Sequence, residues 1–254
     1  MKSVGKIASL LFSVAGFVTP EIEIINVLII GRAVEFTAKV SAQTTQVYIA
    51  PEGPSRKSRT AGTGSRGCDH SGNTKLRLLV PDDHLALTVS ERPTFFWYVS
   101  DTSLPVRFTL VEPGVAEPLV DRTFKVKRPG IVKLTLPADV AGLALNKEYR
   151  WTVSLVCNRE RPSENIYADS SIKRVAIIPA LRSKLAGISQ QEKRSLVYAQ
   201  SGIWYDALNS SYIGYRDNTQ SELAKWYFSK LLAQVGLPVI SERQLQQPNS
   251  ISSQ

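Results

Sequence analysis

Cysteine and histidine are scarce in this 254-residue sequence, which contains two of each. Zinc sites of the familiar kind need closely spaced ligand pairs such as C-x₂₋₄-C, and no such cysteine pair is present. The remaining way to draw a metal site combines Cys68, His70, Asp82 and His84. The turn-forming run Pro81-Asp82-Asp83 accounts for the acidic residues without a metal. We therefore expect neither a metal nor a cofactor.

Local catalytic motifs are also lacking. The sequence has no G-x-S-x-G elbow, no P-loop and no H-E-x-x-H run. Cys68 lies next to His70, which permits a Cys–His nucleophile in principle, but the second cysteine has no role in such a scheme. A hydrolase that acts through scattered carboxylates stays open, because two acids need no local motif.

No apolar run is long enough for a membrane span, which needs about 20 residues. Lys2 and Lys6 instead flank the 12-residue run "IASLLFSVAGFV", which has the length of a signal-peptide core. Val40 and Ala42 then stand at −3 and −1 before Gln43, a favourable cleavage site. We predict a signal peptide over residues 1–42, longer than usual, with a buried N-terminal helix as the alternative. The mature protein is then periplasmic or extracellular and has no transmembrane span.

The balance of charge is positive, at +9 with a pI near 9.6. A basic surface attracts nucleic acid, anionic head groups or acidic polymers. Export removes nucleic acid from this set. We expect an anionic envelope polymer or an acidic protein as the partner, and the sequence does not indicate an oligomeric state.

Residues 43–74 are rich in Gly, Pro, Ser and Thr and contain few apolar residues, which predicts a loop or an extended arm. The candidate anion-binding residues of this arm are Arg56, Lys57, Arg59 and Arg66. The alternative is a solvated linker without a binding role.

Residues 75–178 contain about seven short apolar runs separated by turn-forming residues. Several alternate with period two, as strands with one solvent-exposed face do. In "YRWTVSLVC" the inward set is Tyr149, Trp151, Val153, Leu155 and Cys157. The run "TFFWYV" is apolar on both faces and indicates a central strand. The pattern predicts a mainly β domain, an antiparallel β-sandwich of immunoglobulin-like architecture.

Residues 179–238 change to a helical period, which predicts a C-terminal α-helical hairpin. One helix begins at Ser189 with Glu192 at capping-box spacing, and the second begins at Thr219 with Glu222 and ends at Gly236. Residues 239–254 are predicted to be a frayed, flexible tail. The paired aromatics of the helices and of "TFFWYV" favour a core role over carbohydrate binding.

The blocks "SRGC", "SERPTFFWYV", "GIVKLTLP", "NKEYRWTVSLVC", "SIKRV" and "GIWYDAL" follow one another in this order. In this order they resemble the cyanobacterial family catalogued as domain of unknown function 928, over roughly residues 49 to 238. The resemblance implies an exported or periplasmic protein and supplies no catalytic residues. The chain departs from the family pattern at Ser170-Ser171-Ile172, where the family tends to have Gly-Trp-Ile.

The even cysteine count of an exported protein favours one disulfide between Cys68 and Cys157. Two buried, unrelated thiols are the alternative. We therefore expect an exported, non-catalytic binding or assembly module of the cell envelope. The second hypothesis is an envelope hydrolase that acts on glycans through scattered carboxylates.

Overall fold

The computed structural model describes residues 46–53, 55–63, 74–100, 103–236 and 249–250. All of the described elements belong to one unit, residues 44–254. The predicted signal peptide and its cleavage site lie outside the described residues, as do Arg66, Cys68 and His70. Within the described part of the chain, no helix combines the length and apolarity needed to cross a membrane.

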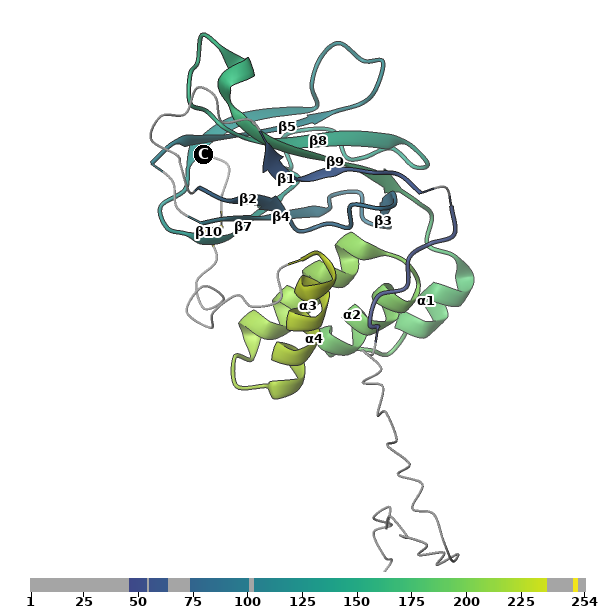
Figure 1. Cartoon of the computed structure of the whole chain (residues 1–254). Coiled ribbons are helices and arrows are strands. Elements are labelled where there is room, and N and C mark those ends of the chain that lie inside the picture. The colour runs from purple at the N-terminus through teal and green to yellow at the C-terminus, as the bar shows by residue number, and fades with distance from the viewer. Residues whose placement is uncertain (1–45, 54, 64–73, 101–102, 237–248, 251–254) are drawn as a thin grey trace, which may run out of the picture. The chain divides into compact units, whose positions relative to one another are not determined.

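In the described residues, ten strands form the sheet, and most neighbours pair antiparallel (Figure 1). The strands are β1 (Arg59–Thr63), β2 (Leu76–Leu78), β3 (Ala86–Thr88), β4 (Thr94–Val99), β5 (Pro105–Val111), β6 (Val120–Lys125), β7 (Gly130–Thr135), β8 (Glu148–Leu155), β9 (Ile166–Arg174) and β10 (Asn249–Ser250). Their order is β10-β7-β4-β2-β1-β9-β8-β5-β6, with β3 beside β9. The pairs β10–β7 and β3–β9 are parallel.

The sheet folds over on itself, so that β5, β8 and β9 lie above β2, β4 and β7 (Figure 1). Strand β1 joins the two layers, because it pairs with β2 on one side and with β9 on the other. The prediction of a mainly antiparallel β fold is confirmed. The immunoglobulin-like sandwich is not confirmed, because the strands follow one continuous path instead of forming two separate sheets.

Aromatic side chains fill the space between the two layers. Phe95 of β4 lies 5.1 Å from both Phe108 of β5 and Trp151 of β8, measured between ring centroids. On the other face of β4, Phe96 lies 5.3 Å from Tyr212 of the helical layer. The sequence prediction that "TFFWYV" is buried on both faces is therefore confirmed.

The described part of the chain also contains four α-helices and one short 3-10 helix. Their bounds are η1 (Pro162–Glu164), α1 (Pro179–Leu185), α2 (Gln191–Gln200), α3 (Trp204–Asp217) and α4 (Glu222–Gln234). The helices lie beneath the layer of β2, β4 and β7 (Figure 1). The predicted hairpin of two helices is incomplete, because the segment expected as one helix from Ser189 is α2 followed by α3. Gly202 separates them with φ +73°, a left-handed conformation that ends a helix.

The predicted helix caps also differ from the structure. Helix α2 begins after Gln190, without a side-chain cap, and not at Ser189. Helix α4 is capped by Ser221, whose Oγ accepts a hydrogen bond from the Ala224 N–H at 3.2 Å, and not by Thr219. Gly236 follows the end of α4 with φ +75°, as the sequence predicted.

Two segments expected to lack regular structure contain strands. Residues 59–63 of the expected arm form β1, because Ala61 pairs with Arg77 of β2 and Arg59 with Asp169 of β9. Residues 249–250 of the expected tail form β10 against β7. Both strands have few apolar residues of their own, and their pairing depends on the strands beside them.

Candidate anion-binding site

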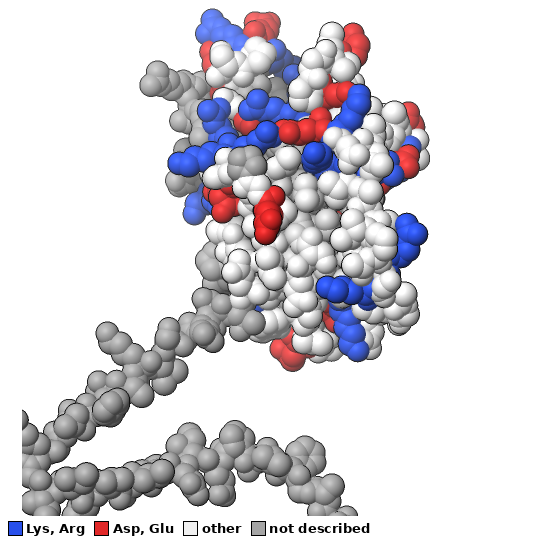
Figure 2. All heavy atoms as spheres, turned by 90° about the vertical axis from the view of Figure 1, so that its right-hand side faces the viewer, with Lys and Arg blue, Asp and Glu red and all other residues white. Residues whose placement is uncertain are grey.

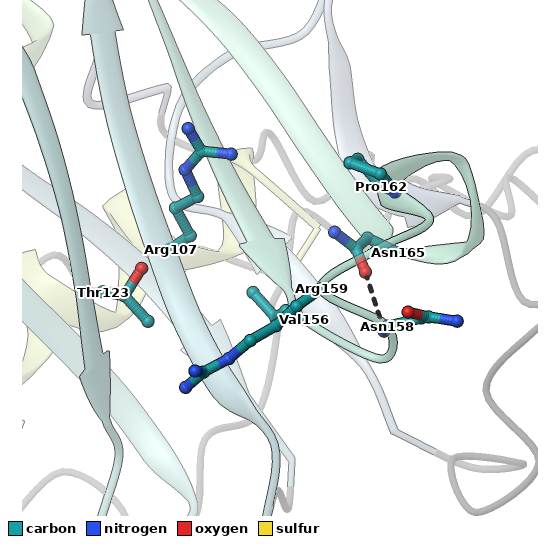
Figure 3. Close-up of a pocket in the computed structure, with 7 residues that line it drawn as sticks. All are labelled: Arg107, Thr123, Val156, Asn158, Arg159, Pro162 and Asn165. Carbon is teal, nitrogen blue, oxygen red and sulfur yellow. Dashed lines mark hydrogen bonds between the residues drawn. The ribbon is translucent and has the colours of Figure 1, made fainter.

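A pocket of about 360 Å³ opens where β8 ends and the chain turns back toward β9 (Figure 3). Two arginines line it from different elements, and their guanidinium groups point in different directions (Figure 3). Arg107 comes from β5, and Arg159 comes from the loop between β8 and β9. We call this site the Arg107–Arg159 pocket, and its lining residues are Arg107, Thr123, Val156, Asn158, Arg159, Pro162 and Asn165.

The loop of residues 156–165 is held by two asparagine side chains. The Oδ1 atom of Asn165 accepts hydrogen bonds from the N–H groups of Cys157, at 2.9 Å, and Asn158, at 3.3 Å. The Oδ1 atom of Asn158 accepts from the N–H groups of Glu160, at 2.9 Å, and Arg161, at 3.3 Å. Asparagine favours such local bonds to the backbone. The pocket wall is therefore an ordered turn.

The carboxylate of Glu164 belongs to this loop and already bonds to other side chains of the loop. Glu164 accepts a hydrogen bond from the Asn158 side-chain amide at 3.1 Å. It also forms an ion pair with Arg161 at 3.2 Å. Glu164 does not line the pocket.

Arg107 carries its positive charge next to an acid on the neighbouring strand. Its Nε and Nη2 atoms donate to the two carboxylate oxygens of Asp121, at 2.7 and 2.5 Å. This bidentate hydrogen bond lowers the pKa of Asp121 below its ordinary value. The ion pair fixes the guanidinium of Arg107 at the pocket edge, with 44% of the side chain still exposed.

Arg159 is exposed and has no hydrogen bond or ion pair with any residue that the structure describes. No aspartate or glutamate lines the pocket. The Thr123 hydroxyl and the Asn165 side-chain amide add neutral hydrogen-bonding groups, whereas the Asn158 side chain and the Asn165 oxygen already bond within the loop. The pocket therefore offers one uncompensated positive charge, one anchored guanidinium and several polar groups, a set that suits an anion carrying hydroxyl groups.

A second, smaller pocket of about 50 Å³ lies where β3 meets the start of α3. Its carboxylate is Asp206, whose Oδ2 atom accepts hydrogen bonds from Thr88 Oγ1 at 2.7 Å and from the Val89 N–H at 3.1 Å. Burial raises the pKa of Asp206 from 3.8 to about 6, although these hydrogen bonds act in the opposite direction. Arg92, which also lines this pocket, donates to the backbone oxygens of Pro137 and Val140. Asp206 thus joins helix to sheet, in a space too small for a substrate.

The comparison with family models matches residues 61–245 to the family described as Domain of Unknown Function (DUF928). This range covers most of the chain and includes both pockets. The chain belongs to the DUF928 family. The resemblance seen in the sequence is therefore confirmed for the family. No curated protein matches the DUF928 chain.

The basic residues singled out in the arm of this DUF928 chain have different surroundings. Arg56 pairs with Glu148 of β8. Arg59 donates to the Tyr167 hydroxyl, and its guanidinium lies 5.1 Å from the centre of the Tyr167 ring. Lys57 is exposed. Arg66 lies outside the described residues, so the structure does not bring the four predicted residues together.

The predicted disulfide stays a prediction, because Cys68 lies outside the described residues. Cys157 lies two residues after the end of β8 and is half-buried against the core. It stands between two residues that line the Arg107–Arg159 pocket, Val156 and Asn158. A bond at Cys157 would therefore anchor the start of the pocket loop.

Of the residues weighed for a metal site, Asp82 and His84 are described, and Asp82 is exposed in the turn before β3. The Nε2 atom of His84 lies 2.8 Å from the Tyr48 hydroxyl, and its Nδ1 atom lies 2.6 Å from a carboxylate oxygen of Asp83. Burial and the charge of Asp83 raise the pKa of Tyr48. In the described residues, no three histidines, cysteines or acids group as metal ligands would. His84 links the N-terminal segment to the turn before β3.

Gly62, Gly64 and Gly67 of the DUF928 chain have the G-x-G-x-x-G spacing of dinucleotide-binding turns. That motif works when a strand leads into a helix whose N-terminus receives the phosphates. Here Gly62 belongs to β1, and the next described element is the antiparallel strand β2. Among the described residues, the spacing therefore lacks its structural context.

Sequence reasoning missed the residues of the Arg107–Arg159 pocket. Arg107 is the single charged residue of β5, at an outward position of an alternating strand, and outward charges also occur in β6, β7 and β8, so its sequence context does not distinguish it. The stretch "CNRERPSEN" does indicate an ordered, basic turn, because two asparagines, two arginines and a proline follow a buried strand.

Proposed function

We propose that this DUF928 protein is a non-catalytic binding module that takes an anionic ligand in the Arg107–Arg159 pocket. The observation that supports this most directly is the composition of the pocket: two arginines line it, and no carboxylate does. Guanidinium groups suit carboxylate, sulfate and phosphate groups because their donors match the oxygens in pairs.

The two arginines contribute to binding in different ways. Arg107 is held in place by Asp121, so its position costs little entropy when a ligand arrives. Arg159 contributes a charge that is not neutralised by a described residue. Thr123 and Asn165 also line the pocket, and the Thr123 hydroxyl and the Asn165 side-chain amide can bond to hydroxyl groups of the same ligand.

The setting we propose for this module is the cell envelope of a cyanobacterium, after export. The support is the predicted signal peptide, the net charge of +9 and the family resemblance. An anionic envelope polymer or an acidic protein then meets the pocket. Mass spectrometry of the secreted protein tests export. We expect an N-terminus at Gln43, and a soluble protein that retains residues 1–30 would contradict it.

An envelope hydrolase acting through two carboxylates receives less support. The Arg107–Arg159 pocket has no acid in its lining, and the smaller pocket contains Asp206 without a second carboxylate. A glycosidase needs two acids that flank the bond to be cleaved.

The test is isothermal titration with digalacturonate, a small acidic sugar, against the full-length protein and Arg159→Gln. We expect the substitution to weaken binding about tenfold, because an open guanidinium–carboxylate contact is removed. Lys193→Gln is the matched control: Lys193 is also exposed, but it lies on α2.

Binding that both variants weaken equally would show that net charge alone attracts the ligand. That result, or the absence of binding to the unsubstituted protein, would overturn the proposed site. Raising the salt concentration should weaken the wild-type complex more than the Arg159→Gln complex, since screening acts on the charge contact.

A further inference from the structure

A row of side chains leads from the Arg107–Arg159 pocket across the outer face of the sheet. Thr123 of β6 is directly opposite Arg107 of β5, and Arg107 is opposite Ser154 of β8. Ser154 is in turn opposite Tyr167 of β9. The row therefore begins with two residues that line the pocket and crosses four strands.

Three of these four side chains carry a hydroxyl group that solvent can reach. Thr123 is exposed, and Ser154 and Tyr167 are half-exposed. Adjacent strands lie about 4.8 Å apart, so three steps carry the row about 14 Å from β6 to β9. The row offers the hydroxyl groups of Thr123, Ser154 and Tyr167, with the Arg107 guanidinium between the first two and the Tyr167 ring at its far end.

Positive charge stands at both ends of this row. Arg107 and Arg159 lie at the pocket end. At the far end, Arg59 lies over the Tyr167 ring and donates to its hydroxyl group. Guanidinium groups therefore lie near the pocket end and at the far end, and the neutral Ser154 hydroxyl lies between them.

The acids beside the row are already paired. Asp121 is held by Arg107. Asp169 accepts from Arg150 at 2.7 Å. Because both carboxylates are neutralised by an arginine on a neighbouring strand, they oppose an anionic ligand less than unpaired acids would.

We propose that the ligand is an acidic oligosaccharide, with one acidic unit in the pocket and the following units along the row of Thr123, Arg107, Ser154 and Tyr167. This inference rests on the proposed function of the pocket. Linked pyranose units advance by roughly one strand spacing, so successive sugars meet successive strands. Sugar hydroxyls bond to Thr123 and Ser154, and a second acidic group reaches Arg59.

A peptide ligand fits this face less well. Extended peptides are recognised through main-chain hydrogen bonds at an open sheet edge. The row crosses β5, β8 and β9 within the sheet, where neighbouring strands already use those main-chain groups. The groups available to a ligand are side-chain hydroxyls, guanidinium groups and an aromatic ring, which match a sugar better.

The test compares oligogalacturonates of two, four and six units in titrations of the full-length protein. We expect the tetramer to bind about tenfold more tightly than the dimer, with little further gain for the hexamer, because the row ends at Arg59. Tyr167→Ala and Arg59→Gln should each reduce the affinity for the tetramer toward that for the dimer, and leave the dimer unchanged.

Tyr227→Ala is the matched control, since Tyr227 is a half-buried tyrosine on α4, away from the row. The melting temperature of Tyr167→Ala shows whether this variant folds. If it does not fold, Arg59→Gln tests the far end of the row by itself. Arg159→Gln should weaken binding at every length.

The outcomes separate the two proposals. Equal affinities for all lengths, with loss in Arg159→Gln, would overturn the row and leave the pocket as the binding site. No binding at any length would overturn both. Tighter binding of a tetraglutamate peptide than of the tetrasaccharide, with the same dependence on Tyr167, would overturn the assignment to a glycan.

Discussion

Asp206 joins α3 to the sheet through hydrogen bonds to Thr88 and Val89. It lies in the first turn of α3, where a carboxylate also meets the positive end of the helix dipole. Burial nevertheless raises its pKa to about 6. The sequence does not reveal this role, because it depends on a strand that is 118 residues away.

We predict that Asp206→Asn removes a pH dependence of stability. The pKa of Asp206 is higher in the folded protein than in the unfolded chain, so protonation of its carboxyl group stabilises the folded state. That contribution is complete below about pH 4 and is lost as pH rises through about 6. The difference between pKa 3.8 and about 6 corresponds to about 3 kcal/mol. Asparagine keeps an oxygen acceptor for Thr88 and Val89 but does not ionise.

Denaturant unfolding between pH 4 and 8 measures this effect. The wild type should lose free energy of unfolding relative to Asp206→Asn as pH rises, because only the wild type ionises. Asp217→Asn, at the exposed end of the same helix, should run parallel to the wild type. The same pH dependence of the free energy of unfolding in all three proteins would contradict the prediction, because it would show that ionisation of Asp206 does not destabilise the folded state.

Single residues were predictable from the sequence where alternation identifies a face. Tyr149, Trp151, Val153 and Leu155 are buried, as the period-two pattern of β8 predicts. The partners of the outward residues were not predictable. Arg107 is opposite Thr123, and it reaches Asp121 diagonally only because of the register between β5 and β6.

The strands and helices were predicted best where long apolar patterns occur. The expected runs for β2, β4, β5, β6, β7, β8 and β9 all contain strands. Strands β1 and β3 were missed because each is short, and its stability comes from neighbouring strands. The helix expected from Ser189 was too long because apolar spacing continues through Gly202, although the backbone there is left-handed.

We predict that Gly202→Ala destabilises the junction between α2 and α3 more than Gly187→Ala destabilises its own turn. Both glycines have positive φ, at +73° and +75°, so both substitutions strain the backbone by about 1–2 kcal/mol. A Cβ at Gly202 would also lie 3.3 Å from Pro51, whereas a Cβ at Gly187 meets open space.

Thermal unfolding of the two variants measures this difference. Gly202→Ala should melt at the lower temperature, since the segment around Pro51 must move away. The Ile49 N–H donates to the Ala199 oxygen at 3.1 Å, and hydrogen exchange at Ile49 should become faster in Gly202→Ala alone. Equal melting temperatures would contradict the close packing of this junction.

The molecule as a whole was predicted at the level of class. A mainly β region followed by helices is confirmed, because the change from a period of two to a helical period is visible in the sequence. The path of the sheet was not predictable. It depends on β1, which joins the two layers through pairs with β2 and β9, and strand order is not encoded in local periodicity.

We predict that Cys68 and Cys157 form a disulfide in the exported protein. Closing a loop of 89 residues would stabilise the fold by about 4–5 kcal/mol on the chain-entropy model. It would also hold Cys157 next to the pocket residues Val156 and Asn158. Thiol titration under denaturing, non-reducing conditions should find no free thiol. Adding a reducing agent to the folded protein should lower its melting temperature. Two free thiols would contradict the prediction.

The central claim is that an anionic ligand binds in the Arg107–Arg159 pocket, and NMR mapping of the bound protein tests it most directly. Titration of ¹⁵N-labelled protein with digalacturonate should move the amide signals of Asn158, Arg159 and Asn165, which belong to the pocket wall. Signals from α4 should stay in place. Shifts confined to α4 or to residues 55–59, with the pocket loop unchanged, would contradict the account.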